Sequence, residues 1–270
     1  MKLALAPLGR ALLGLTSALV LLGCPAVYPE LGTRTRPLPA GQPLDPPPPQ
    51  ELRWIRFLSG TVPEHTRDGR TWQKNGKLAD PYAKLIVGGK ELLRTPVQHD
   101  TLSPTWPGSP SGNFKVGPDD KFRVELWDSN TLNDSPICVQ EVRAIAEDQL
   151  VEKKIRFSCD SGAEVILAFE DAHAIKGAGL WYELRTDSCF VTRMLDGSPA
   201  QRAGLEAGDQ ILQLGGKSVS AMSSDEVRSV FNAIPVDGLS VQAKHATGTT
   251  VSLILKEGPI YPLFEQQPVD

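Results

Sequence analysis

Residues 197–217 read GSPAQRAGLEAGDQILQLGGK, and this stretch decides the fold of the C-terminal part of the chain. Ser198 and Pro199 predict the start of a short helix, because serine caps a helix N-terminus and proline fits the first turn. Gly204 and Gly208 predict tight turns that need a positive φ angle. These residues therefore shape the backbone and carry no chemistry of their own.

The segments on either side of this stretch complete a small α+β domain over residues 173–258. The predicted element order is strand, strand, short helix, strand, helix, strand, strand. The flanking strands are expected at 181–185, 190–195, 238–245 and 250–256, and the second helix at 223–234. Residues 259–270 are expected to form a C-terminal tail.

The stretch closely resembles the GSPAxxAGLxxGDxIxxIxGxxV signature of PDZ domains, with Val219 at the last position. The resemblance implies a module that binds a peptide by adding it as a strand to the edge of residues 181–185. The backbone N–H groups of the loop before that strand are expected to hold a terminal carboxylate as a nest. The expected peptide-binding residues are Gly177, Ala178, Gly179, Leu180, Trp181, Tyr182, Ser224, Val227, Arg228 and Phe231.

Two residues of that set, Ser224 and Arg228, affect which ligand the domain would prefer. Ser224 begins the second helix where many PDZ domains carry a histidine that selects a Ser/Thr ligand, and Arg228 would favour an acidic ligand. The pocket for the last ligand side chain is expected from Leu180, Tyr182, Val227 and Phe231. The alternative is a PDZ fold that serves only as a spacer or docking surface.

Residues 51–172 alternate between apolar and polar positions in short runs that turn signals separate. This period of two predicts an eight-stranded antiparallel β-sandwich, so we expect the chain to be mainly β. The expected strands lie at 54–57, 82–87, 92–98, around 114, 121–127, 137–145, 154–157 and 164–169.

Two segments of this region resemble C2 domains, the calcium-dependent lipid-binding sandwiches. Residues 75–84 (NGKLADPYAK) are similar to the NGKSDPY-V-K segment, and residues 101–106 (TLSPTW) to the T-L-x-P-x-W turn. The resemblance implies calcium-binding loops, because hard cations take several carboxylate oxygens. The candidate calcium ligands are Asp80, Asp128, Asn130 and Asp134.

The calcium set is incomplete. Gln73 and Lys74 stand where the family carries an early first-loop aspartate. A lost carboxylate and a nearby ammonium weaken a divalent site, so the alternative is that the aspartates only cap turns. Trp72, Leu78 and Leu132 are expected at the loop tips that would touch a lipid surface, unless Trp72 packs on its own loop.

Residues 1–24 (MKLALAPLGRALLGLTSALVLLGC) combine basic residues with an apolar stretch that is short for a bilayer span. The ending LLGC resembles the lipobox of bacterial lipoproteins. The resemblance implies removal of residues 1–23, acylation of Cys24 and a stable anchor in the cell envelope. Pro25 favours the outer membrane, facing the periplasm, because retained lipoproteins commonly carry aspartate there. The alternative is an ordinary signal peptide with an incidental cysteine.

The proline-rich residues 24–50 predict a stiff polyproline II tether that joins no sheet and reaches on the order of 80 Å. In this prediction the sandwich (51–172) lies next to the tether and the PDZ-like domain lies at the far end. A proline-rich ligand for a partner is the rival interpretation. Export implies an oxidising compartment, so we expect a Cys138–Cys159 disulfide, while pairs with Cys189 stay open.

Net charge is −4, from 28 basic and 32 acidic residues, which argues against a nucleic-acid partner. The sequence contains no GxSxG, HExxH or Walker motif and its four histidines are scattered, so we expect no enzyme. We expect an envelope lipoprotein that acts as a protein-binding adaptor for the peptide terminus of an envelope partner. Two alternatives stay open: C2-mediated docking on a lipid surface, and a regulatory subunit of a separate envelope protease.

Overall fold

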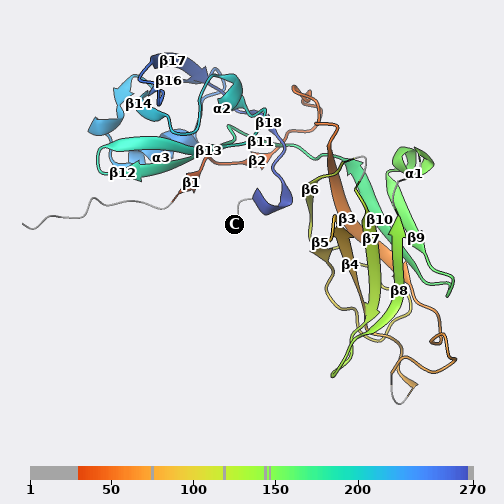
Figure 1. The fold of residues 1–270 in the computed structure, drawn as a ribbon. Helices are drawn as coiled ribbons and strands as arrows, with labels where there is room; N and C mark the ends of the chain where they lie inside the picture. The colour runs from red at the N-terminus through yellow and green to blue at the C-terminus, as the bar shows by residue number, and fades with distance from the viewer. Residues whose placement is uncertain (1–29, 74–75, 118–119, 143–144, 146, 267–270) are drawn as a thin grey trace, which may run out of the picture.

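The chain forms two β-rich bodies that short connections join (Figure 1). The computed structural model describes residues 30–266 apart from 74–75, 118–119, 143–144 and 146. Cys24, its leader and Lys74 lie outside the described residues. In the described part of the chain, no helix is long and apolar enough to cross a membrane.

The N-terminal body is a sandwich of two antiparallel four-stranded sheets, as the alternation pattern predicts. One sheet has the strand order β6-β3-β10-β9 and the other has the order β5-β4-β7-β8. A short helix, α1 (Glu147–Glu152), which that pattern does not predict, precedes β9. The strands are β3 (Leu52–Thr61), β4 (Pro81–Val87), β5 (Lys90–Arg94), β6 (Ser111–Lys115), β7 (Phe122–Asp128), β8 (Ser135–Val142), β9 (Lys154–Ser158) and β10 (Glu164–Asp171).

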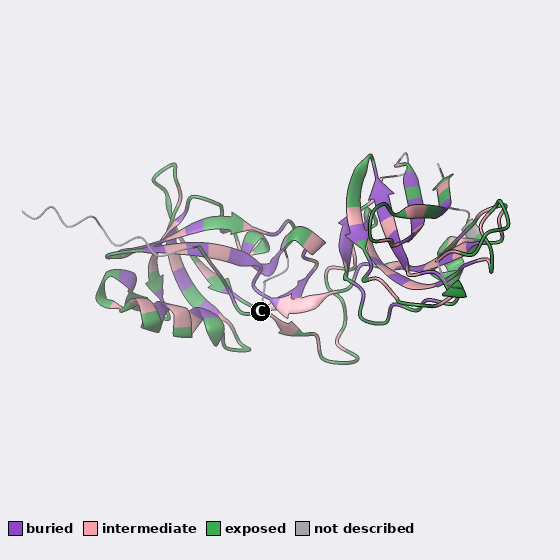
Figure 2. Cartoon of the chain, turned by 90° about the horizontal axis from the view of Figure 1, so that it is seen from below, coloured by how far each residue is buried: buried purple, intermediate pink, exposed green. Residues whose placement is uncertain are grey.

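Buried apolar residues from both sheets form one core, and Figure 2 shows the buried stretches of their strands in purple. Trp106 and Phe57 are fully buried there, with their rings edge to face at 6.0 Å. Cys138 and Cys159 form a disulfide, the pairing that the sequence favours, with Cα atoms 5.8 Å apart. Cys189 is a free thiol in the core of the C-terminal body, and burial raises its pKa to about 12.

The C-terminal body is built on an antiparallel sheet with the strand order β1-β12-β13-β14-β16-β17, in which β1 is Leu31–Gly32 and β15 pairs with β14. A smaller sheet has the order β18-β11-β2. The elements are β11 (Ile175–Gly177), β12 (Leu180–Arg185), β13 (Ser188–Met194), α2 (Pro199–Arg202), β14 (Gln210–Leu214), β15 (Lys217–Ser218), η2 (Val219–Ala221), α3 (Ser224–Asn232), β16 (Leu239–Lys244), β17 (Thr250–Leu255) and β18 (Gly258–Ile260).

Local signals in the sequence account for the helices and turns of this body. The hydroxyl of Ser198 caps α2, which begins with a proline. Gly204 and Gly208 have φ angles of 99° and 95°, as the turns require. Ser223 and Glu226 form a reciprocal capping box that begins α3.

The segment before β3 does not form a free tether. β1 (Leu31–Gly32) pairs antiparallel with β12, and β2 (Arg36–Pro37) pairs antiparallel with β11. The prediction that residues 24–50 join no sheet is therefore wrong at these two points. Residues 31–36 contain no proline, so their N–H groups can bond, and Pro37 lies in an edge strand, where proline is tolerated.

The first described residues of the chain therefore pair with the C-terminal body and not with the sandwich. Figure 1 shows β1 and β2, near the red end of the colour scale, beside β12 and β11. The chain then enters the sandwich at β3 and leaves it at β10. The prediction that the PDZ-like domain lies at the far end from the N-terminal segment is therefore wrong, although this segment still leads directly into the sandwich.

Asn113 in β6 links the two bodies. Its Nδ2 donates hydrogen bonds to the carbonyl oxygens of His173, at 2.9 Å, and Pro262, at 3.1 Å. Its Oδ1 accepts a hydrogen bond from the backbone of His173 at 2.8 Å. Nearby, Phe264 in η3 (Phe264–Gln266) stacks on Phe114 at 5.2 Å, so residues beyond the last strand pack on the sandwich.

Candidate functional site

The loop between β11 and β12 is built around a glycine that no other residue can replace easily. Gly179 has a φ of +72°, and a Cβ placed on it would lie 2.6 Å from the Cβ of Ser198. Gly177 lies against Ile260 of β18 and Thr35 of the N-terminal segment. The absence of side chains at Gly177 and Gly179 therefore lets neighbouring segments approach the backbone of this loop closely.

The residues expected to line a ligand side-chain pocket are buried in the core on which Leu31 packs. Leu180, Tyr182, Val227 and Phe231 all have side chains that are about 2% exposed or less. The rings of Tyr182 and Phe231 lie 4.6 Å apart, and burial raises the pKa of Tyr182 to about 12. Ser224 begins α3, where Arg228 pairs with Asp225 at 3.4 Å.

The outer edge of β12 holds an extended segment of the same chain. Leu31 lies opposite Tyr182, and Gly32 lies opposite Trp181, in an antiparallel ladder. Thr33 extends the contact, because its N–H donates to the carbonyl of Leu180 at 3.0 Å. We call Glu30–Thr33 the strap. The strap lies at the edge of β12, where the resemblance to PDZ domains predicts an added peptide strand.

Three side chains of the C-terminal body clamp the start of the strap. Glu30 accepts a hydrogen bond from Thr192 at 2.6 Å and pairs with Arg193 at 3.6 Å. The guanidinium of Arg193 lies 4.1 Å from the centroid of the Trp181 ring. Trp181 in turn covers Gly32, since a Cβ on Gly32 would lie 3.1 Å from its Nε1.

A cavity of about 480 Å³ adjoins the strap. Its lining combines the strap, the glycine loop and the small sheet, including Thr33, Gly179, Trp181, Leu195 and Ile260. Sequence reasoning missed the strap and its clamp. The one signal that points to the strap is the proline-free run Leu31–Arg36 inside a segment otherwise rich in proline.

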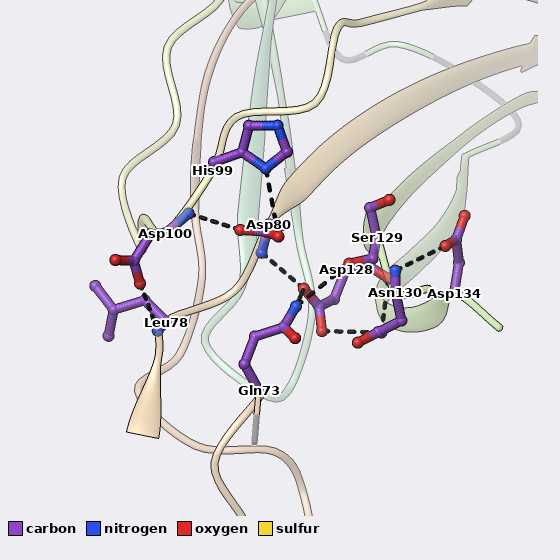
Figure 3. A network of polar contacts seen from close by, with 9 residues as sticks. All are labelled: Gln73, Leu78, Asp80, His99, Asp100, Asp128, Ser129, Asn130 and Asp134. Carbon is purple, nitrogen blue, oxygen red and sulfur yellow. Dashed lines mark hydrogen bonds and ion pairs between the residues drawn. The ribbon is translucent and has the colours of Figure 1, made fainter. Parts of the chain in front are cut away.

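The second candidate site is the acidic loop cluster at the end of the sandwich (Figure 3). One Asp128 oxygen accepts hydrogen bonds from the backbone of Asp80, at 2.7 Å, and from Nε2 of Gln73, at 3.2 Å. Its other oxygen accepts one from Nδ2 of Asn130 at 3.1 Å. Burial raises the pKa of Asp128, and these hydrogen bonds act against that rise.

The other two carboxylates of the cluster also have protein donors. Asp80 accepts from the backbone of Asp100 at 2.7 Å and pairs with His99 at 3.3 Å. Asp134 accepts from the hydroxyl of Tyr82 at 2.7 Å, and this bond lowers the pKa of Asp134. Burial and the same bond raise the pKa of Tyr82 to about 12.

This arrangement does not fit calcium. A calcium ion needs several carboxylate oxygens that converge, and in the described residues these loops contain no acidic trio with converging ligand atoms. The amide of Gln73 donates to Asp128 at the position where the family carries an aspartate. The described trio whose ligand atoms lie within 4.8 Å of one another is Glu206, Asp209 and His245, in the other body.

Two of the three expected lipid-contacting residues are exposed. Leu132 is 91% exposed and Leu78 is 38% exposed. Trp72 instead packs against the core of the sandwich, and its Nε1 donates to the carbonyl of Pro63 at 2.7 Å. For Trp72 the structure therefore agrees with the alternative prediction, in which this side chain packs on its own loop.

Comparison with known proteins supports both domains. A family model described as a C2 domain matches residues 64–155, and one described as a PDZ domain matches residues 175–242. No curated protein matches the chain in sequence.

Three solved structures are similar to part of the chain. A calcium-bound pair of C2 domains from Extended-Synaptotagmin 2 is 19% identical, with 47% of this chain and 48% of that chain covered and a TM-score of 0.36. A structure described as a C2 domain is 18% identical (44% and 96% covered, TM-score 0.33). A C2 domain of a plant Extended Synaptotagmin 1 is 15% identical (46% and 98%, TM-score 0.31). The chain spans about half the length of the first of these.

Proposed function

Because the chain carries a C2 domain followed by a PDZ domain, we propose that it is an envelope adaptor that captures an extended peptide of a partner protein. The peptide adds as a strand to the edge of β12, and the PDZ match suggests a peptide C-terminus as one such ligand. Acyl chains on Cys24 anchor the chain in the outer membrane, facing the periplasm. The chain binds in this proposal and catalyses no reaction.

The observation that carries the proposal is the strand pairing of β1 with β12. An exposed sheet edge presents unpaired N–H and C=O groups, and main-chain hydrogen bonds to them supply affinity in strand addition. Leu31 and Gly32 make this kind of pairing with Tyr182 and Trp181. The edge of β12 is thus shaped to accept an extended strand of antiparallel polarity.

The position of the strap supports a PDZ domain held close to the membrane. Five residues separate Cys24 from Glu30. An extended chain covers at most about 3.6 Å per residue, so the acylated cysteine lies within roughly 20 Å of the strap. Two or three acyl chains give a stable anchor. The partner peptide in this proposal is therefore presented near the membrane surface.

A peptide screen on the full chain with Cys24→Ser tests the proposal. Peptides with free and amidated C-termini are screened in excess, and hits are mapped by backbone hydrogen exchange. Because the strap already pairs with that edge, a bound peptide is expected to speed exchange at residues 31–33 while β12 stays protected. The opposite edge of the same sheet, β17, is the internal control. Failure of every peptide to bind, or new protection of β17 without faster exchange at residues 31–33, would contradict the proposal.

Leu132 favours a second function, docking of the C2 domain on a lipid surface without calcium. Leu132 is 91% exposed in the loop between β7 and β8, at the end of the sandwich away from the PDZ domain (Figure 1). Liposomes of phosphatidylethanolamine and phosphatidylglycerol should float with residues 24–270 carrying Cys24→Ser, which lack the apolar leader, equally well with calcium and with chelator. Leu132→Asp should lose flotation, whereas Val236→Asp, at an equally exposed valine of the PDZ domain, should retain it. Equal flotation of both variants would exclude this role for Leu132.

A further inference from the structure

We propose that the strap is a built-in ligand of the β12 edge, and that partner segments of the same chemical class bind by displacing it. That class is an internal, extended segment with an acidic, an aliphatic, a glycine and a hydroxyl residue in succession. The inference rests on the proposed function, because it names the ligand and the regulation of the same edge.

The path of the chain shows that this ligand is internal. After Thr33 the chain continues past the glycine loop, where the carbonyl of Arg34 and the methyl of Thr35 lie 3.5 and 3.3 Å from a Cβ placed on Gly177. It then pairs with β11 as β2. The place where a terminal carboxylate would end is thus crossed by a continuous backbone. Strand addition here needs no free carboxylate.

Each position of the strap meets a distinct feature of the PDZ domain. The acidic position meets Thr192 and Arg193, which offer a hydroxyl and a guanidinium. The aliphatic Leu31 packs partly buried against the domain core. At the next position Trp181 leaves room for glycine, because a larger residue would press on its ring. These contacts define side-chain preferences as well as main-chain pairing.

The hydroxyl position has the most specific contact. The N–H and Oγ1 of Thr33 both donate to the carbonyl of Leu180, at 3.0 and 3.2 Å, and Thr33 is 6% exposed. Burial of a polar side chain is tolerated here because its hydroxyl is bonded. A partner segment with serine or threonine at this position can reproduce both bonds.

The strap competes strongly although it is short. β2 and the ion pair of Arg36 with Glu257, at 2.8 Å, hold the following residues on the same domain. The strap is therefore presented at a high effective concentration, of the order of millimolar for a short connection. A free peptide binds only the open fraction of the chain, so its apparent affinity falls in proportion to that fraction.

The test uses the full chain with Cys24→Ser and a labelled, C-terminally amidated peptide of residues 28–35 (YPELGTRT) as the probe. Leu31→Asp places a charge against the apolar core, and Thr33→Pro removes both bonds to Leu180, so each opens the strap by a different route. Leu44→Asp is the matched control, because Leu44 belongs to the same segment, lies outside the strap and is exposed. Leu31→Asp and Thr33→Pro should each bind the probe at least about tenfold more tightly than the chain with the natural strap or the Leu44→Asp control.

Changes in the probe test the ligand class. Probes with Gly32→Leu or Glu30→Lys should bind the opened chain more weakly than the original probe. Equal probe binding by all chains would overturn displacement and leave the proposed function standing. Opened variants that bind library peptides but not the probe would overturn the ligand class alone. If the opened variants bind no peptide of any kind, the inference and the proposed function both fail. If the chain with the natural strap sediments as a dimer whose copies exchange straps, the proposal that each strap binds β12 of its own chain would be overturned.

Discussion

The carbonyl oxygen of Leu180 accepts two hydrogen bonds from Thr33, one from its N–H at 3.0 Å and one from its Oγ1 at 3.2 Å. Leu180 is the first residue of β12, and Thr33 lies nine residues after the cysteine that we propose is acylated. The segment that carries the proposed anchor is therefore also the occupant of the proposed peptide edge. In the proposed function, these few residues would couple anchoring to ligand capture.

Removal of the Arg193 side chain should loosen the strap without unfolding the domain. Arg193 contributes an exposed ion pair and a cation–π contact, each worth about 1 kcal/mol or less. We expect Arg193→Ala to speed hydrogen exchange at residues 31–33 several-fold, with little change in the urea midpoint. Arg185→Ala, which removes similar contacts to Glu183 and Phe190 away from the strap, is the control. Equal exchange at the strap in both variants would contradict the clamp.

Replacement of Gln73 by aspartate should create a response to calcium that the natural chain lacks. Gln73 donates to Asp128 at 3.2 Å, so an aspartate there adds a carboxylate and removes a donor. Without metal, Gln73→Asp should lower stability by about 1 kcal/mol, because Asp128 loses a hydrogen bond and gains a like charge. Calcium should then raise the Tm of the variant and leave the Tm of the natural chain unchanged. A rise in the natural chain would show that these loops bind calcium as they stand.

The pair His245–Asp209 should make stability depend on pH. The hydrogen bond to Asp209, at 2.8 Å, raises the pKa of His245 above its usual 6.5. Because the folded state holds this proton more tightly than the unfolded state, the stabilisation is full below the usual pKa and is lost as pH rises through the raised one. The difference in unfolding free energy between the natural chain and His245→Gln should therefore shrink as pH rises from below 6.5 through the raised pKa. A difference that grows with pH would refute the assignment.

Loss of the disulfide should destabilise the C2 domain. Cys138 and Cys159 are 21 residues apart, and closing a loop of that size stabilises by about 3 kcal/mol in the chain-entropy account. Cys138→Ser together with Cys159→Ser should lower the unfolding free energy of the sandwich by about this amount. Cys189→Ala, at a buried thiol of the other body, serves as a control for the loss of a thiol that is not in a disulfide and should leave the unfolding of the sandwich unchanged. An unchanged urea midpoint in the double variant would contradict a structural role for the bond.

The sequence was sufficient for the architecture because the deciding interactions are local or periodic. Each of the eight predicted runs overlaps one sandwich strand, and the alternation is clearest in Phe122–Trp127; the run expected at 92–98 instead forms its strand at Lys90–Arg94. The caps at Ser198 and Ser223 act within four residues, so they too can be read directly from the sequence.

The strap could not be predicted in the same way. A strand of two residues has almost no pattern of its own, and its pairing depends on an edge about 150 residues further along the chain. The contact between the rings of Tyr182 and Phe231 was not predicted for a similar reason, since it depends on the final rotamers of two residues that lie far apart in the sequence. The hydrogen bond from Gln73 to Asp128 requires two loops to lie close together, and the sequence alone does not specify how they pack.

The most direct test of the account is the hydrogen exchange of the Thr33 amide in the full chain with Cys24→Ser. Its N–H donates to Leu180 within an antiparallel pairing, and its residue is buried. The account predicts exchange at least about a hundredfold slower than for an open chain, because opening must precede exchange. The protection should disappear in Leu31→Asp and persist in Leu44→Asp. Exchange of Thr33 at the open-chain rate would show that the edge of β12 is free, and the central claim would fail.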